Sequence, residues 1–389
     1  MSTLHIHFTY AEDSGEIRRI KNINSVLAQN LSDKVIEVAF ISIANFIKYK
    51  ENKFKLSPSV QKKFYFPNLP LSQSNHFFKR LNSYWGSFII FILWLLYQPK
   101  FAIAEFSIGW QVLRFLPRSV KCIIDVHGAT REEYEYSATT PNKQLAETYD
   151  YFERKGMSNA SYIVCQSDAM KKYLLKKYNF LKENKIFTYK CGADNKLFFI
   201  DKAMRSKMRE ELGIKDTETL FVYSGGIHKW QKIEDSMATF VEYSKVGDAK
   251  FLILTLNKEK AQALIDKQYG SLKNRFIVHS TTNSEVYKYL NAADIAFLLR
   301  DNVVLNQVAS PTKLAEYMFC GLPIISSDVS QMWVENTSFI FNIDKNDIKE
   351  IVNFIKNVDK EAIAEYAQEF LSLECDKKNI SRLIDETRK

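Results

Sequence analysis

The sequence lacks the cysteine patterns that stabilise secreted domains or bind zinc. Its 389 residues include five cysteines, an odd number, and no two of them form a C-x-x-C pair. Scattered cysteines of this kind are typical of reduced thiols in the cytoplasm. The N-terminus also lacks the basic, apolar and small-residue segments of a secretory signal, so we expect a cytoplasmic protein.

Arginine-rich runs, internal repeats and low-complexity segments are absent as well. The formal net charge of +9 is a moderate basic excess, which suits anionic substrates or a membrane surface. Without an arginine-rich run or a zinc pattern, we expect no nucleic-acid partner. A hydrophobic fraction of 46% with 25% charged residues indicates a globular protein, and the length is sufficient for two domains.

One apolar segment stands out, the uninterrupted run from Trp85 to Leu96. It is shorter than the ~20 residues that a helix needs to span a bilayer. Two interpretations remain open. The segment is either a helix buried in the first domain or a surface helix that contacts lipid, with Lys79 and Arg80 beside it.

Strand and helix patterns alternate along the chain. A strand over 4–8, a polar loop containing Gly15, a helix to about residue 31 and a strand over 35–43 form one βαβ unit of a parallel sheet. Residues 50–80 read as irregular. Further strands are expected over 101–106, 120–126, 159–167, 185–190, 220–223, 251–256, 276–280 and 294–299, and the chain from residue 345 reads as helical to its end.

His127 and Gly128 follow the strand over 120–126 directly. Ligands of open α/β sheets bind at the carboxyl ends of parallel strands. A lone histidine is usually structural, but this location makes His127 an equally good candidate for a ligand contact.

Glycines also follow the strand over 220–223, in Ser224-Gly225-Gly226. Backbone amides of such a loop can cradle a phosphate, and Lys229 or Lys232 can supply positive charge. After the strand over 294–299, Arg300 reads either as a phosphate clamp or as the ion-pair partner of Asp301.

The most informative stretch is a short helix that begins after Ser310-Pro311 and ends at Gly321. Ser310 is a good N-cap and Pro311 suits the first helical position. Lys313 lies in the first turn, where the helix dipole disfavours a cation, unless a bound phosphate compensates. Glu316 lies on the same side and can accept hydrogen bonds from sugar hydroxyls. Alternatively, Lys313 and Glu316 form an ordinary surface ion pair.

The motif Ser-Pro-x-Lys, Glu-Tyr and Cys-Gly-x-Pro over 310–323 resembles the donor-nucleotide helix of GT-B glycosyltransferases, specifically the retaining family 4. The resemblance runs from about residue 120 to 330 and is strongest over 294–327. It implies an α/β fold of two Rossmann-like domains whose parallel sheets face an interdomain cleft. We expect an acceptor-side domain over 1–200, a donor domain over 201–365, and a C-terminal helix over 366–389 that packs back on the first domain.

The resemblance also implies the activity. We expect a hexosyltransferase that moves a sugar from a nucleotide diphosphate sugar to a saccharide or lipid-linked acceptor, in surface polysaccharide or glycoconjugate biosynthesis. It would work without a metal or another cofactor, in the cytoplasm and in peripheral contact with the inner face of the cell membrane. Two alternatives are a nucleotide-sugar epimerase or hydrolase of the same fold, and a non-catalytic, membrane-associated partner protein.

The implied site residues are His127 as the catalytic residue, Glu316 on the donor ribose, Gly15 in the donor and acceptor loop, and Asn306 at the donor sugar. The donor diphosphate would be bound by Gly225, Gly226, Lys229, Lys232, Arg300, Ser310, Thr312 and Lys313. The sequence departs from the family at Val308, where many members carry a first glutamate, and at Gly226 and Gln231, where members usually have arginine and lysine.

Overall fold

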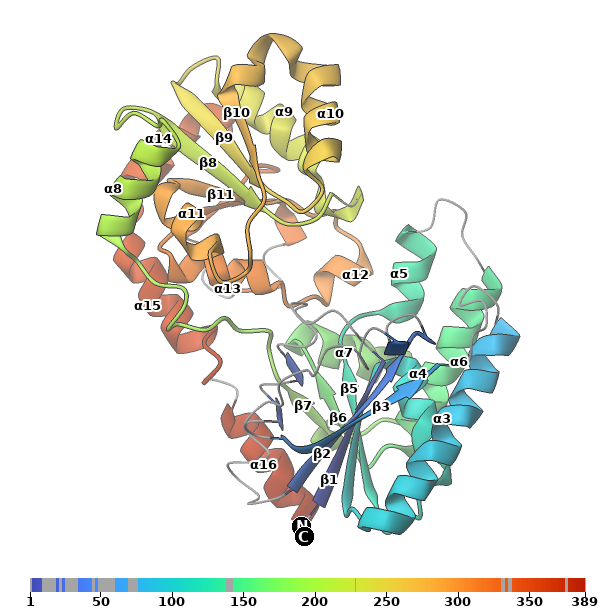
Figure 1. Cartoon of the computed structure of the whole chain (residues 1–389). Coiled ribbons are helices and arrows are strands. Elements are labelled where there is room, and N and C mark those ends of the chain that lie inside the picture. Colours follow the sequence, from blue (N-terminus) through green and yellow to red (C-terminus); the bar gives the residue numbers. More distant parts are fainter. Residues whose placement is uncertain are drawn as a thin grey trace. The chain divides into compact units, whose positions relative to one another are not determined.

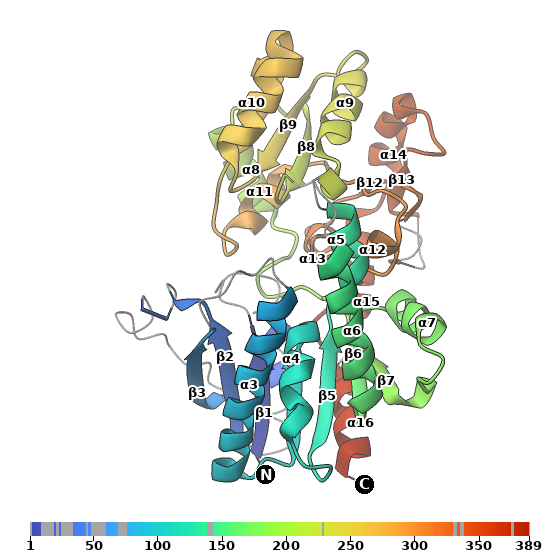
Figure 2. The same ribbon diagram turned by 90° about the vertical axis from the view of Figure 1, so that its right-hand side faces the viewer.

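The chain forms two compact units in the computed structural model: residues 1–190 with 376–389, and residues 191–375. The structure describes residues 2–8, 19–20, 23–24, 34–43, 46–47, 60–68, 76–137, 143–227, 229–329, 333–334, 338–374 and 377–388. Gly15 and most of the helix expected before residue 31 lie outside these ranges. Figures 1 and 2 show the helices and strands of each unit.

The first unit contains a parallel sheet with the strand order β3-β2-β1-β4-β5-β6-β7. From β1 the chain adds β2 and β3 on one side and then returns to place β4 on the other side of β1. The strands are β1 Ser2–His7, β2 Lys34–Ile41, β3 Val60–Pro67, β4 Phe101–Glu105, β5 Lys121–Val126, β6 Tyr162–Cys165 and β7 Ile186–Thr188. Most of their side chains are buried, as parallel strands covered on both faces require.

Helices cover both faces of this sheet, with α3, α4 and α6 on one face and the C-terminal α16 against the other (Figure 1). Ile380, Leu383 and Ile384 of α16 pack with Val164 and Phe187 of the sheet. The helices are α3 His76–Tyr97, α4 Phe106–Val112, α5 Thr130–Ser137, α6 Lys143–Asn159, α7 Asp168–Lys177 and α16 Lys377–Arg388, with 3-10 turns η1 Leu113–Phe115 and η2 Glu183–Lys185.

The second unit repeats the same plan with the parallel order β10-β9-β8-β11-β12-β13. Its strands are β8 Thr219–Ser224, β9 Ala249–Leu254, β10 Phe276–His279, β11 Ile295–Leu298, β12 Ile324–Ser326 and β13 Ile340–Asn342. Its helices are α8 Lys202–Glu211, α9 Ile233–Tyr243, α10 Lys258–Tyr269, α11 Val286–Ala292, α12 Val304–Gln307, α13 Thr312–Phe319, α14 Ile351–Asn357 and α15 Lys360–Phe370, with 3-10 turns η3 Lys229–Gln231, η4 Gly270–Arg275 and η6 Ile348–Glu350.

Helix α8 is fastened to the second sheet by one partly buried acid, Asp294. Asp294, just before β11, accepts hydrogen bonds from Arg205 at 2.6 Å, from Arg209 at 3.1 Å and from the Leu220 backbone N–H at 2.8 Å. The sequence placed the domain boundary near residue 200, in this polar segment. The two compact units divide after Lys190, and α8 belongs to the second unit.

Two expectations from the sequence differ from the structure. Residues 60–67 were expected to be irregular, yet they form β3, the outer strand of the first sheet. The adjacent Lys62 and Lys63 suit an edge strand, where lysine is common. The end of the chain is not continuously helical, because breaks near 358–359 and 371–374 separate α14, α15 and α16.

No helix in the described part of the chain combines the length and the apolar character that crossing a bilayer would require. Helix α3 extends over 22 residues and includes the apolar run. It is neither wholly buried nor wholly exposed. One face packs into the first unit, where Ile90 and Leu93 are buried, and the opposite face is open to solvent at Phe88 and Leu95.

Candidate functional site

The second unit brings its candidate residues to the point where the strand order reverses. From β8 the sheet continues to β9 on one side and to β11 on the other. Gly225 follows β8, and Arg300 lies two residues after β11. Open α/β sheets bind ligands outside the carboxyl ends of the strands at this switch point. The fold therefore places both residues where a ligand is expected.

Gly225 and Lys313 approach each other so closely that only glycine fits. A Cβ atom on Gly225 would lie 1.7 Å from the Lys313 Nζ and 2.7 Å from its Cε. The backbone φ of Gly225 is +153°, which side-chain-bearing residues rarely adopt. The ammonium group of Lys313 thus rests directly on the glycine loop, 5.2 Å from the centre of the Tyr223 ring.

Lys313 and Arg300 are two neighbouring cations without an acidic partner. No carboxylate of the described residues lies within ion-pair distance of either. Arg300 is 8% exposed. Among the described residues, its guanidinium donates to the backbone carbonyls of Leu299 and Gln231. Burial, together with the positive charge of Arg300, lowers the pKa of Lys313 to about 7, against a smaller opposing effect of Glu316. An anion bound here would offset the repulsion between Arg300 and Lys313 and would stabilise the charged form of the lysine.

The other predicted cations are arranged differently. Lys232 pairs with Asp235 at 2.7 Å and with Asp301 at 3.0 Å, so its charge is already compensated. Asp301, the alternative partner of Arg300, forms an ion pair with Lys232, and the role of Arg300 as a phosphate clamp stays a prediction. Lys229 is exposed on the turn η3. Arg300, which follows a different strand, could supply the charge missing at Gly226, and this stays a prediction.

The start of α13 corrects one expectation. Ser310 does not cap the helix: the N-cap is Pro311, and no side chain caps the first turn. The Ser310 hydroxyl instead accepts a hydrogen bond from the Cys191 backbone N–H at 3.0 Å. Thr312 begins the helix, and Glu316 lies one turn further on, 6% exposed.

Two buried tyrosines hold this arrangement in place. The Tyr317 hydroxyl accepts a hydrogen bond from the Ser224 backbone N–H at 2.8 Å, which ties α13 to the end of β8. The Tyr223 hydroxyl lies 2.6 Å from both the Gly226 carbonyl and the Gln231 side-chain oxygen. Gln231, which stands where the family usually has lysine, thus braces the loop.

Asn306 is 2% exposed in α12 and is engaged with its own loop. The side-chain amide of Asn306 donates to the Asp301 backbone carbonyl at 2.9 Å. The backbone carbonyl of Asn306 accepts a hydrogen bond from the Trp333 indole N–H at 2.9 Å. Val308, at the position of the missing glutamate, is buried. In this arrangement Asn306 shapes the loop before α13, and contact with a sugar stays a prediction.

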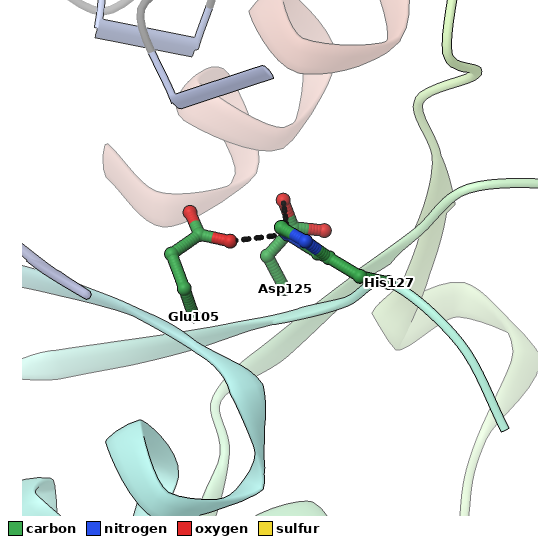
Figure 3. Close-up of side chains that lie close together, drawn as sticks. All are labelled: Glu105, Asp125 and His127. Carbon is green, nitrogen blue, oxygen red and sulfur yellow. Dashed lines mark hydrogen bonds and ion pairs between the residues drawn. The ribbon is translucent and has the colours of Figure 1, made fainter. Parts of the chain in front are cut away.

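The first unit places a second polar cluster at its own switch point, between β1 and β4. Figure 3 shows His127 beside Glu105 from the end of β4 and Asp125 from β5, with dashed lines from its ring to both carboxylates. The Nε2 of His127 lies 3.1 Å from an oxygen of Asp125 and is also paired with Glu105. Both carboxylates are fully buried, and His127 is 10% exposed. The structure thus joins His127 to two acids.

This cluster continues across the sheet as a chain of buried charged and polar groups. Arg19 donates to both oxygens of Asp125, at 2.7 Å each. Glu105 is also bonded to His5, and His5 lies 2.5 Å from the Asn24 side-chain oxygen. A neighbouring group joins His7 to Glu37 at 3.0 Å and Glu37 to Lys63 at 2.5 Å.

The sequence reasoning identified only His127 among these groups. The others were read as parts of strands, although charged residues inside buried parallel strands are themselves a signal, since they need partners when buried. Histidines at positions 5 and 7, and acids at 37, 105 and 125, all lie in or at the end of segments predicted to be strands.

The charge of His127 follows from its partners. Burial disfavours the protonated ring, but Asp125 and Glu105 outweigh it and raise the pKa of His127 to about 10. At neutral pH the ring is therefore an imidazolium, which can donate hydrogen bonds or stabilise negative charge but cannot accept a proton. The ligand atoms of the three residues lie within 4.8 Å of one another. Arg19 forms an ion pair with Asp125, and the protonated His127 ring pairs with both Glu105 and Asp125.

Comparison with known proteins agrees with this geometry. Residues 218–361 match the sequence model of the family "Glycosyl transferases group 1". Sucrose-phosphate synthase from Thermosynechococcus elongatus has a similar structure, with a TM-score of 0.74, 14% identity and 99% of each chain covered. The fold is GT-B.

Two further solved structures have this GT-B fold. HepE from Anabaena, in complex with UDP-glucose, gives a TM-score of 0.65 at 12% identity and covers 99% of this chain and 100% of its own. WaaG, a glycosyltransferase involved in lipopolysaccharide biosynthesis, gives 0.68 at 12% identity and covers 99% of both chains. No curated protein sequence matches the chain. The domain match and these neighbours together support a glycosyltransferase.

Proposed function

We propose that this GT-B protein is a retaining, family 4 type glycosyltransferase that moves a hexose from a nucleotide diphosphate sugar to a saccharide or lipid-linked acceptor. The observation that carries the proposal is a pair of cations, the partly buried Lys313 and the buried Arg300, at the loop of Gly225. Neither cation has an acidic partner among the described residues. A diphosphate has the charge and the size to interact with both.

The same pair accounts for catalysis of bond cleavage. When the bond between the sugar C1 and the phosphate oxygen breaks, its electron pair goes to the diphosphate, which gains negative charge. Preorganised positive groups in a site with little water stabilise that charge in the transition state. Lys313, Arg300 and the uncapped first turn of α13 supply them in the second unit, and we propose that they do so without a metal.

Glu316 is proposed to bind the donor ribose, because it lies one turn along α13 from Lys313. His127 is proposed as the catalytic residue of the first unit. With a pKa of about 10, its role would be to donate a hydrogen bond or to stabilise charge on the sugar or phosphate, and not to act as a general base.

The biological setting is proposed from the neighbours. WaaG acts in lipopolysaccharide biosynthesis, and HepE binds UDP-glucose. By this analogy we propose a role in the assembly of surface polysaccharide or another glycoconjugate, with a uridine nucleotide as the first donor to test. The protein would work in the cytoplasm, at the inner face of the cell membrane.

Calorimetric titration with UDP-, GDP- and ADP-sugars tests the proposal. The parent protein should bind at least one of them, and Lys313→Met should bind it more than about tenfold more weakly, since a charged hydrogen bond to the diphosphate is lost. The control Lys258→Met, which removes an exposed lysine of α10, should leave the affinity unchanged. Absence of binding to every donor would refute the proposal.

Incubation of the bound donor without any acceptor then separates transfer from other chemistry. A transferase should leave the donor intact until an acceptor is added, and NMR of the product should show the anomeric configuration of the donor. Conversion to an epimer or rapid release of free sugar would instead identify a different enzyme of the same fold.

A further inference from the structure

The solvent face of α3 is apolar along its whole length. Between residues 77 and 97 the exposed side chains are all large and hydrophobic except Arg80, and their exposure ranges from 38% for Ile92 to 68% for Leu96. The apolar stripe consists of Phe77, Leu81, Tyr84, Phe88, Ile92, Leu95 and Leu96. Because these residues recur at intervals of three and four, they lie on one side of the helix.

A surface helix of a globular protein normally shows polar residues to solvent. Helix α3 reverses this rule and has no acidic residue. At 22 residues it is about 33 Å long, and Phe115 of η1, 46% exposed, extends the apolar stripe beside Tyr84. A continuous exposed surface of this kind marks an interaction site.

Basic residues predominate in the segment that carries the apolar stripe. Residues 76–124 contain six basic residues and one acid, Glu105, which is buried. The guanidinium of Arg114 lies 4.1 Å from the centre of the Tyr84 ring, and the ammonium of Lys62 lies 5.0 Å from the Tyr97 ring at the other end of the helix. Lys100 and Arg118 are exposed just beyond that end.

We propose that the apolar stripe of α3, with its basic rim, docks this protein on the surface of an anionic lipid bilayer. Apolar side chains would enter the boundary between headgroups and acyl chains, while arginine and lysine remain at the level of the anionic headgroups. A second copy of this chain fits less well, because a two-fold contact through α3 would bring the same basic rims together. Figure 2 shows α3 along the outer side of its unit, beside α4.

This inference deepens the membrane location proposed above and names the surface responsible for it. The test is co-sedimentation with vesicles of phosphatidylcholine alone and of phosphatidylcholine with 30% phosphatidylglycerol (a composition chosen on the order of natural anionic content). The parent protein should bind the anionic vesicles and lose binding as salt is raised. Failure to bind them would overturn the inference.

Two variants separate the apolar and the basic contributions. Phe88→Ser with Leu95→Ser should reduce partitioning by more than about tenfold, since two large apolar groups no longer leave water. Arg80→Ser with Lys100→Ser should reduce it by roughly 25-fold on anionic vesicles, about fivefold for each charge. Equal binding by either variant and the parent would contradict the inference.

The matched control is Val246→Ser with Leu256→Ser, which removes two exposed apolar side chains of the second unit and should leave vesicle binding unchanged. Sedimentation equilibrium of the parent adds a second readout. A dimer that the Phe88 and Leu95 substitutions dissociate would assign the face to self-association and refute the lipid proposal. Because the vesicles contain neither donor nor acceptor, failure here would leave the transferase proposal standing.

Discussion

Donor binding should be coupled to the uptake of a proton by Lys313. The pKa of this lysine is lowered to about 7 by burial and by Arg300, and a diphosphate beside it would raise that pKa again. Affinity for a nucleotide sugar should therefore be nearly constant below pH 7 and decrease above it. Between pH 6 and 8.5 the protonated fraction falls roughly 30-fold, and the association constant should fall by a similar factor.

The assay is calorimetric titration with a nucleotide sugar, in pairs of buffers that differ in ionisation enthalpy. A nucleotide sugar is preferred to the free diphosphate because its phosphates carry no proton that titrates in this range. At pH 7 the complex should take up about half a proton, and near pH 8.5 almost a whole one. Lys313→Arg keeps a permanent charge, so it should bind with little dependence on pH.

The sign of this effect distinguishes binding from folding. A lysine whose pKa is lower in the folded protein than in the unfolded chain makes the folded state more stable as pH rises from about 7 toward its ordinary value. Loss of affinity over the same range cannot then be attributed to unfolding caused by this group. A flat profile in the parent protein, or an undiminished slope in Lys313→Arg, would refute the reasoning.

Three further substitutions test other parts of the structure. Gly225→Ala should abolish measurable donor binding while the protein still unfolds cooperatively, because the added methyl group would occupy the position of the lysine ammonium; calorimetry and thermal unfolding check this. Asp294→Ala should destabilise the second unit by about 3 kcal/mol in urea unfolding, since it leaves the buried Arg209 without its acid. Glu105→Gln should lower the pKa of His127 from about 10, visible by NMR of the ring protons; an unchanged pKa would mean that Asp125 alone sets it.

Much of the fold could be predicted because it depends on local patterns. Buried strands followed by glycine and then by a helix identify the parallel sheets, and β8 with Gly225 illustrates this. Residues 60–67 were missed because an edge strand covered on one side has no continuous apolar run. The attachment of α8 was also not visible in the sequence, because its arginines bind Asp294, almost ninety residues further along the chain.

The site was predictable in its residues but not in its pairings. Composition and position pointed to Lys313, Arg300 and Lys232 alike. Only the three-dimensional arrangement shows that Lys232 forms ion pairs with Asp235 and Asp301. Within the described part of the chain, Lys313 and Arg300 form no such pair. In the first unit, His127 pairs with Glu105, and Arg19 binds Asp125, which also contacts His127; no spacing rule connects these positions.

The return of α16 to the first unit has a consequence for biosynthesis. Its apolar residues complete the packing of a sheet whose strands all lie before residue 190. During translation the second unit can therefore fold as soon as it emerges, whereas the earlier half must wait, with part of its interior uncovered, until residues 377–388 leave the ribosome. The half that is made first is finished last, so a chain that ends before residue 377 would leave part of the hydrophobic interior of the first unit uncovered.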